Sequence, residues 1–497
     1  MDSNQTNKQI WQYRNDQNGR RRKNPKKPST SAMLPPEATS PLKLPEKTVK
    51  SPNKLVSRQS TSGSGGKSKS RSVELIRRNK YVVDENSDTR SYTTTSKNQR
   101  INKAICLRMS HRQDSEAESE SKSQKVATKK SRRFNQELKK PLGDARCIEA
   151  AMSLFGYHED ESDLVNASPS NEFGNNEQSL ADASEAREKL RTIFKGFATL
   201  CEGMTIELIN KEFSELPPPP KEKECAEFHK NRRRNRYQDI FCMEASRVKL
   251  QFLADEVGGN DYIHANRVDY PSFKSRYILT QGPRKNTVID FWRMVWQEKT
   301  SVIVMLCQLV EGSREKCSEY YPKESGPTML LGNGLIKVTN MSQHTVDGVV
   351  TSQLKLCHLS SERIVTHYQW TEWPDYTVPD SKKSETIFKI LRHIRWRNTP
   401  VVVHCSAGIG RSGTLIAIEM CLMDCLHSEV PQVSRAVRFL RLKGRSQAIQ
   451  SVVQYMAIRK VVLDFGITHN LIDSEDFPSF SSLYEESVHI AQQTLQK

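Results

Sequence analysis

The pattern of apolar and polar positions changes character along this chain. Up to residue 135 the sequence is rich in Ser, Thr, Asn, Lys, Arg and Pro, as in the tract Ser60–Ser70, and shows no regular apolar period. Such a stretch cannot bury enough apolar surface to offset the entropy that a chain loses on folding. We therefore predict that residues 1–135 are disordered.

Between residues 136 and 203 the apolar pattern is weak. Helical spacing is found near Ala145–Phe155 and again at Leu180–Leu200, and a segment rich in Asn, Ser and Asp separates the two. We predict a linker with weakly helical segments, and it offers no candidate chemistry.

From Met204 to about residue 467, short apolar runs alternate with helical patterns. Strands are predicted at Tyr277–Thr280, Ser301–Cys307, Leu335–Thr339, Thr351–Cys357, Arg363–Trp370 and Val401–Val403. Helices are predicted at Ile206–Leu216, Asp290–Lys299, Glu385–Trp396, Gly413–Leu426, Pro431–Leu442 and Gln447–Leu463. Because strands dominate the first half and helices the second, the pattern predicts an α+β domain over residues 204–467, with a mixed sheet flanked by helices. Residues 468–497 are then a C-terminal tail.

Charge is unevenly distributed between these regions. Residues 1–135 hold 31 Lys and Arg against 12 Asp and Glu, a net charge of +19, whereas the remaining residues hold 45 and 46. The overall charge of +18 therefore belongs to the N-terminal tail, which argues against a uniformly basic nucleic-acid-binding protein. The basic cluster at residues 20–27 is a candidate for nuclear localisation, or for binding polyanions or an acidic partner.

Cysteine usage and hydropathy bear on the compartment. The 11 cysteines are scattered without a CxxC pair, which is typical of reduced thiols inside a cell. The N-terminus lacks the apolar core of a signal peptide. The most apolar runs, Val302–Leu309 and Leu415–Leu426, are too short or too interrupted to span a bilayer. We expect a cytoplasmic protein without a transmembrane segment.

The segment from Val401 to Thr414 carries the clearest chemistry. An apolar run is followed by a glycine-rich turn, and a helix is expected to start near Arg411. Backbone N–H groups in such a turn, together with a helix N-terminus, form an anion-binding site. A thiol in that position beside an arginine has a pKa below its usual value of about 8.5. Cys405 is therefore a candidate nucleophile, and Arg411 a candidate clamp for two oxygens of a phosphate.

Two other interpretations of this loop compete with that one. The run from Gly408 to Gly413 is also a G-x-G-x-x-G sequence after a strand, as dinucleotide-binding folds have. Such a loop has no use for a cysteine and an arginine around its glycines, and Asp424, the nearest candidate for a ribose-binding acid, lies inside the next helix. A buried structural cysteine is the second alternative, and the arginine six residues later argues against it.

The sequence His404–Thr414, HCSAGIGRSGT, resembles the signature loop of the phosphotyrosine-specific protein tyrosine phosphatases. The resemblance extends over roughly Met204–Asp464 and implies that family's mixed, highly twisted β-sheet flanked by helices. It implies a non-receptor enzyme that forms a cysteinyl-phosphate intermediate, needs no metal or organic cofactor and acts on phosphotyrosine-containing proteins. The loop residues that would bind the phosphate are Ser406, Ala407, Gly408, Ile409 and Gly410.

The same resemblance assigns roles beyond the loop. Trp373-Pro374-Asp375 resembles the family's mobile acid loop, which makes Asp375 the candidate general acid and base. Gln450 is similar to the glutamine that positions the attacking water, and Gln454 to its support. Ser412 resembles the hydroxyl that stabilises the leaving thiolate.

A phosphotyrosine-recognition loop is indicated at Asn235–Asp239. Tyr237 would pack against the substrate ring and wall a slot too deep for phosphoserine, and Asp239 would accept hydrogen bonds from the substrate backbone. Glu311 matches a loop whose glutamate pairs with the signature arginine. The three arginines at 232–234 are candidates for favouring acidic residues around the target.

Some positions depart from the family's pattern. His264 stands where asparagine is usual, Thr377 replaces a common glycine of the acid loop, and Val452 and Val453 follow the catalytic glutamine where polar residues are common. Asp380 is a rival carboxylate that lacks the motif. A catalytically weak phosphotyrosine-binding adaptor and a dual-specificity phosphatase therefore remain as alternatives.

Overall fold

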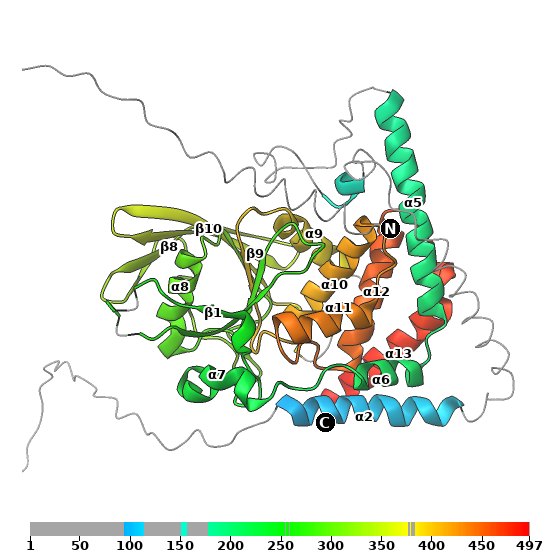
Figure 1. Cartoon of the computed structure of the whole chain (residues 1–497), viewed down its shortest axis with the longest axis horizontal. Helices are drawn as coiled ribbons and strands as arrows, with labels where there is room; N and C mark the ends of the chain where they lie inside the picture. The colour runs from blue at the N-terminus through cyan, green and yellow to red at the C-terminus, as the bar shows by residue number, and fades with distance from the viewer. Residues whose placement is uncertain are drawn as a thin grey trace, which may run out of the picture. The chain divides into compact units, whose positions relative to one another are not determined.

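A computed structural model describes residues 94–113, 151–156, 177–253, 255–257, 259–375, 378 and 383–496, all within the compact unit Val83–Lys497. A mixed sheet of nine strands stands beside a group of helices (Figure 1). The basic cluster at 20–27, Thr377 and Asp380 lie outside the described residues.

The sheet has the strand order β1-β2-β3-β11-β4-β10-β9-β8-β7. Its strands are β1 (Arg247–Lys249), β2 (Tyr262–Val268), β3 (Tyr277–Thr280), β4 (Val302–Met305), β7 (Thr328–Leu331), β8 (Ile336–Val346), β9 (Val349–His358), β10 (Ser361–Trp370) and β11 (Val401–His404). β3, β11, β4 and β10 pair in parallel and the outer strands are antiparallel. A separate hairpin pairs β5 (Val310–Glu311) with β6 (Arg314–Glu315). The predicted α+β class with a mixed sheet is confirmed.

The helices lie mainly in the second half of the sequence, as predicted. They are α2 (Thr94–Gln113), α5 (Glu177–Glu202), α6 (Ile206–Ser214), α7 (Ala226–Lys230), α8 (Val288–Gln297), α9 (Ser384–Arg395), α10 (Arg411–Leu426), α11 (Val433–Phe439), α12 (Val452–Thr468) and α13 (Pro478–Gln496). Short 3-10 turns occur at Glu222–Cys225, Arg232–Arg234, Glu244–Ser246, Lys285–Thr287 and Ser474–Asp476, and a π turn occupies Leu440–Gly444.

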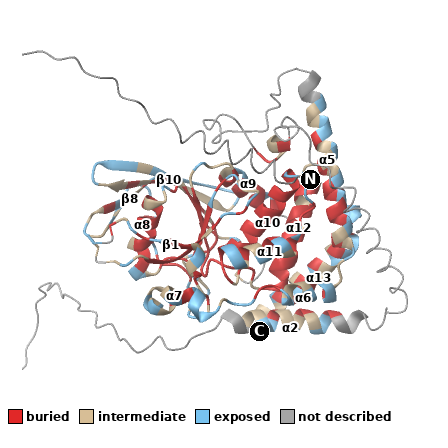
Figure 2. Cartoon of the chain, viewed as in Figure 1, coloured by how far each residue is buried: buried red, intermediate tan, exposed pale blue. Residues whose placement is uncertain are grey.

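The core centres on β11 and α10. β11 is buried along its whole length between β3 and β4, which explains its continuous valine run. Every residue of α10 is buried, because this helix is surrounded by other elements on all sides (Figure 2). The turn between them therefore starts and ends on rigid elements, at the carboxyl edge of the parallel strands, where ligands bind in such sheets.

Two helices were not expected from the sequence. The predicted disorder of residues 1–135 is wrong for α2, whose Ile101, Ile105 and Met109 are buried on one face. The expected C-terminal tail contains α13, which buries Phe480 and Tyr484. Both helices carry a narrow apolar stripe that gains its partners only when the chain folds, since α2 packs on α6 and α13.

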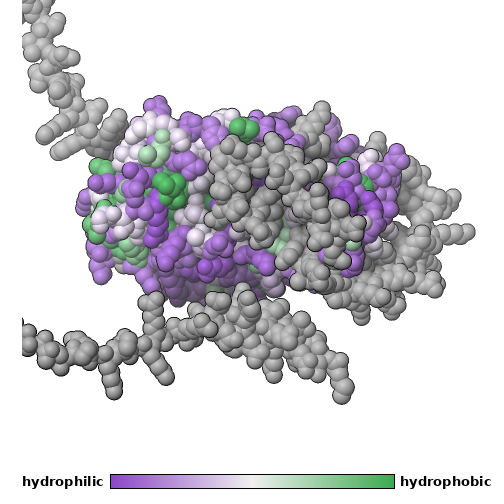
Figure 3. Space-filling model, turned by 90° about the horizontal axis from the view of Figure 1, so that it is seen from above, coloured by the Kyte–Doolittle hydropathy of each residue, from purple (hydrophilic) through white to green (hydrophobic). Residues whose placement is uncertain are grey.

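The surface supplies no sign of a membrane span. In the part of the chain that the structure describes, no helix combines the length and the apolarity needed to cross a membrane. Figure 3 shows one face of the molecule, on which hydrophilic residues predominate and hydrophobic ones form small separate patches.

Candidate active site

The turn from Cys405 to Gly410 joins β11 to α10. The backbone N–H of Gly408 donates to Cys405 Sγ at 3.2 Å. Gly408 has a φ of 71°, and a Cβ there would lie 2.1 Å from the carbonyl oxygen of Thr280, so only glycine fits. The thiol therefore lies inside the turn and faces its backbone donors. The Cys405 side of the predicted anion site is assembled as the sequence indicated.

A buried arginine explains how the turn presents its N–H groups inward. Arg445 is 0% exposed and donates from Nη2 to the carbonyl of Ala407 at 2.9 Å and from Nε to that of Gly408 at 3.3 Å. Because these carbonyls point at Arg445, their peptide planes turn the neighbouring N–H groups the other way. Sequence analysis missed Arg445; a buried arginine is rare without partners, but its burial cannot be read from spacing.

Arg411 begins α10 and is held in a fixed plane. Its Nη1 and Nη2 donate to the two carboxylate oxygens of Glu311 at 2.6 and 3.1 Å, and Nη1 also donates to the carbonyl of Trp373 at 3.1 Å. The pairing with Glu311 that the resemblance implied is confirmed by these distances. Burial opposes the charge of Arg411, but Asp375 and the other negative groups outweigh it, and its pKa is raised.

The acid loop lies against this arginine. Asp375 Oδ1 accepts from Arg411 Nη2 at 3.2 Å, and Oδ2 accepts from Lys316 Nζ at 2.5 Å. Burial lowers the pKa of Lys316, but Asp375 more than offsets this, so the net shift is upward. Two carboxylates and two cations from four separate segments thus meet beside the thiol.

The glutamine segment is a turn rather than the start of a helix. A helix was predicted over Gln447–Leu463, but α12 begins at Val452, because Gln447 and Ile449 have φ values of 59° and 65°. Non-glycine residues adopt such angles only when tertiary contacts impose them.

This turn presses on the Cys405 loop. Gln450 N–H donates to Gln454 Oε1 at 2.9 Å, and the N–H of Ile449 donates to the carbonyl of Ile409 at 3.0 Å. A Cβ on Gly410 would lie 2.3 Å from Gln450 Oε1 and 3.1 Å from Gln454 Nε2. Both amides therefore lie against the backbone of the loop, and Gly410 leaves room for them.

The predicted recognition loop borders the same cavity. Tyr237 Oη lies 2.7 Å from Ser406 Oγ, which in turn donates to the carbonyl of Lys316 at 2.9 Å. Gln447, which sequence analysis also missed, donates from Nε2 to the carbonyl of Asp239 at 2.9 Å. Tyr237 and Asp239 are thus fixed relative to Cys405.

Ser412 occupies the first turn of α10. Its Oγ is buried and has no hydrogen-bond partner among the residues that the structure describes. The structure therefore brings together every residue for which the sequence predicted a role in the site. Over the same described residues, no group of three or more His, Cys, Asp or Glu side chains could hold a metal ion.

Residues 231–464 match the sequence model of the family described as protein-tyrosine phosphatase. The matched range contains the Cys405 loop, the acid loop and the glutamine turn. This part of the chain is a protein-tyrosine phosphatase domain.

Curated relatives of the phosphatase domain support the same assignment. Tyrosine-protein phosphatase non-receptor type 9 of Homo sapiens is 35% identical over 270 residues, which cover 50% of this chain and 44% of that protein. Tyrosine-protein phosphatase non-receptor type 2 of Homo sapiens is 39% identical over 242 residues, covering 47% and 57%. Receptor-type tyrosine-protein phosphatase C of Homo sapiens is 35% identical over 243 residues, covering 48% and 18%. The chain thus spans about half the length of the first two relatives.

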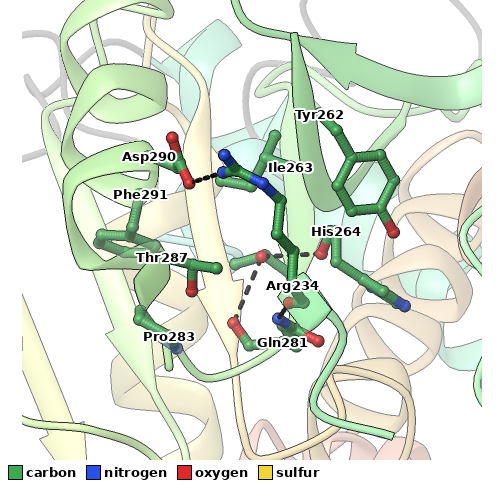
Figure 4. Close-up of a pocket in the computed structure, with 10 residues that line it drawn as sticks. Arg234, Tyr262, Ile263, His264, Gln281, Pro283, Thr287, Asp290 and Phe291 are labelled. Carbon is green, nitrogen blue, oxygen red and sulfur yellow. Dashed lines mark hydrogen bonds and ion pairs between the residues drawn. The ribbon is translucent and has the colours of Figure 1, made fainter. Parts of the chain in front are cut away.

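The arginine run beside the recognition loop of the phosphatase domain is only partly available to a substrate. Arg234 pairs with Asp290, which is 2% exposed (Figure 4). Its charge is therefore committed inside the fold, and only Arg232 and Arg233 are exposed. The predicted preference for acidic residues rests on those two.

His264 lies in the same buried region (Figure 4). Its Nε2 lies 2.9 Å from the carbonyl oxygen of Ile240, whereas Nδ1 is buried and unpartnered among the described residues. Burial, and then the positive charge of Arg445, lowers the pKa of His264 to about 3. The imidazole is therefore neutral at pH 7 and acts as a rigid support behind the recognition loop.

Replacing His264 with asparagine should weaken the acid sensitivity of the fold. The unfolded chain protonates this histidine near pH 6.5, but the folded protein does so only near pH 3, so its contribution to stability is lost as the pH falls through that window. In His264→Asn, the free energy of unfolding should change less steeply between about pH 6 and pH 4, by about 1.4 kcal/mol per pH unit. Urea unfolding across pH measures this slope. The difference between the two proteins at pH 8 isolates the lost contacts, and an unchanged slope would contradict the prediction.

Proposed function

We propose that this protein hydrolyses phosphotyrosine in other proteins through a cysteinyl-phosphate intermediate. The observation that carries the proposal is the position of Cys405 Sγ inside the turn, 3.2 Å from the N–H of Gly408, with Arg411 held beside it. Backbone donors and a fixed guanidinium both stabilise a thiolate and bind a phosphate dianion. The family membership of residues 231–464 supports the same activity.

In the first step the Cys405 thiolate attacks the phosphorus atom. The bond between phosphorus and the tyrosine oxygen breaks, and its electron pair leaves with the phenolate. A tyrosine phenolate has a conjugate acid with a pKa near 10, so it needs a proton, which Asp375 donates. N–H groups from Ser406 to Gly410 and the fork of Arg411 hold the three non-bridging oxygens.

In the second step water attacks the phosphorus atom of the cysteinyl phosphate. Gln450, supported by Gln454, orients the water, and Asp375 accepts its proton. The bond between phosphorus and sulfur breaks, and its electron pair returns to Cys405 as thiolate, which the hydroxyl of Ser412 stabilises. Inorganic phosphate leaves and the enzyme is restored.

Tyr237 makes phosphotyrosine the favoured substrate. Its hydroxyl is tied to Ser406, so the ring stands as a wall beside the loop that holds the phosphate. A flat aromatic substrate can pack on that wall and reach the thiol, whereas a phosphoserine side chain is too short. Asp239 would orient the substrate by accepting hydrogen bonds from its backbone. Because the mechanism needs a reduced thiol, we place the activity in the cytoplasm or nucleus.

The test compares phosphate release by the full chain from a phosphotyrosyl peptide and from the same peptide with phosphoserine. We expect kcat/KM to be at least about 100-fold higher for the phosphotyrosyl peptide, since a rigid slot can reject a substrate that fails to fill it. Equal rates would favour the dual-specificity alternative. Binding of the phosphotyrosyl peptide without any phosphate release would favour the adaptor alternative and overturn the proposal.

A further inference from the structure

Helix α2 reaches the active site although it lies outside the matched phosphatase domain. It precedes residue 231 by more than a hundred positions, yet it lies along α6 and α13 (Figure 1). Ile101, Ile105 and Met109 share one buried face, and burial of such a face is what attaches a helix to its neighbours. The polar residues of α2 are therefore free to serve another purpose.

One of these polar residues contacts the glutamine turn. Asn102 Oδ1 accepts a hydrogen bond from the backbone N–H of Val452 at 3.0 Å. Val452 is the first residue of α12, and a helix begins with N–H groups that have no partner inside the helix. Ser451 Oγ accepts from the N–H of Gln454 in the same turn, so α12 is capped twice, once locally and once by α2.

The first turns of α2 also lie near the acid loop. Lys97, five positions before Asn102, is close enough to Lys316 and Asp375 for their charges to act on it. Burial and the positive charges of Arg314 and Lys316 lower the pKa of Lys97, against the effect of Asp375. One helix thus borders both groups that handle the water and its proton in the second step.

We propose that Asn102 is a positioning residue for hydrolysis of the cysteinyl phosphate. The inference rests on the proposed function. By accepting the N–H of Val452, Asn102 holds the start of α12 in place. Gln450 lies two residues before that point and Gln454 lies two residues after it. A shift of this turn would move the amide of Gln450 away from Gly410, and with it the water that must attack in line with the sulfur.

This role separates the two chemical steps. Formation of the intermediate uses Cys405, Arg411 and Asp375, none of which contacts Asn102 through a recorded bond. Hydrolysis alone depends on an oriented water. Loss of the Asn102 acceptor should therefore slow the second step and leave the first unchanged, whereas a general loosening of the domain would slow both.

The experiment measures the two steps by rapid mixing of the full chain with a nitrophenyl phosphate ester. The burst of nitrophenol reports formation of the intermediate, and the later steady rate reports its hydrolysis. In Asn102→Ala we expect the burst rate to stay unchanged and the steady rate to fall about threefold to thirtyfold, the range expected from loss of one helix cap. The fraction of phosphate transferred to added glycerol should rise, because a poorly held water competes less well with an alcohol.

Two further variants complete the test. Asn102→Asp keeps an acceptor at the positive end of α12 and should restore the steady rate. Arg108→Ala removes the bond from Arg108 Nη1 to Gln493 Oε1, at 2.7 Å, which ties α2 to α13 away from the glutamine turn, and should change neither step. Wild-type values in Asn102→Ala, or an Asn102→Asp protein as slow as Asn102→Ala, would overturn the inference. A wild-type protein that releases no nitrophenol would instead refute the proposed function.

Discussion

Replacing Cys405 with serine should abolish phosphate release from a phosphotyrosyl peptide. The hydroxyl is nearly the same size as the thiol, but it stays protonated at neutral pH and is a poor nucleophile without a general base. We expect kcat to fall at least about 10⁴-fold, as it does when other enzymes lose a covalent nucleophile. Release of inorganic phosphate over time measures this directly.

The matched control is another cysteine far from the site. Cys357 lies on β9, half-buried, and Cys357→Ser should keep kcat within about twofold of the wild type. Cys405→Ser should also retain binding of the phosphotyrosyl peptide, because the backbone donors and Arg411 do not depend on the sulfur. Substantial turnover by Cys405→Ser would show that another group attacks the phosphate.

The Cys405 loop could be predicted because its chemistry is local in sequence. A buried strand, a glycine-rich turn and a helix start are adjacent, so spacing alone indicates an anion site. Even so, only the structure explains the individual glycines. Gly408 is required by its close approach to the carbonyl of Thr280, and Gly410 by the amides of Gln450 and Gln454.

Supporting residues could not be predicted, because their partners lie far away in the sequence. Arg445, Gln447 and Asn102 act on backbone atoms of the loop, of the recognition segment and of α12, respectively. No periodicity links such pairs. The helix predicted to begin at Gln447 failed for the same reason, since tertiary contacts override the local apolar pattern there.

The terminal helices illustrate a different limit. A tail with three buried residues on one helical face has too little apolar surface to predict a fold by itself. α2 is stable only because α6 and α13 offer a complementary surface. The strand and helix alternation between Tyr277 and Leu463, by contrast, was predictable because each of those segments buries most of its own length.

The charges in the site suggest how substrate binding prepares the proton donor. Glu311 and Asp375 share Arg411, and Asp375 also pairs with Lys316. A phosphate dianion in the loop would compete with Asp375 for Arg411. The carboxyl group would then lie beside the substrate oxygen with less positive charge around it, which favours its protonated form.

Replacing Asp375 with alanine should therefore separate binding from turnover. We expect kcat for a phosphotyrosyl peptide to fall about 10²–10⁴-fold, the usual contribution of a general acid, while the peptide still binds. Binding should become tighter, because the phosphate no longer competes with a carboxylate for Arg411. The loss should be much smaller for a nitrophenyl ester, whose more acidic phenol leaves without a proton. Steady-state kinetics on both substrates and a direct binding measurement test these expectations.

The control for this prediction is a neighbouring carboxylate. Glu372 is exposed and pairs with Lys383 at 2.7 Å, so Glu372→Gln should keep kcat within about threefold of the wild type. If Asp375→Ala lowered kcat equally for both substrates, Asp375 would act by holding Lys316 and Arg411 in place rather than by donating a proton. A loss confined to the phosphotyrosyl peptide requires proton transfer, because the two esters differ at the leaving oxygen and share the same phosphate.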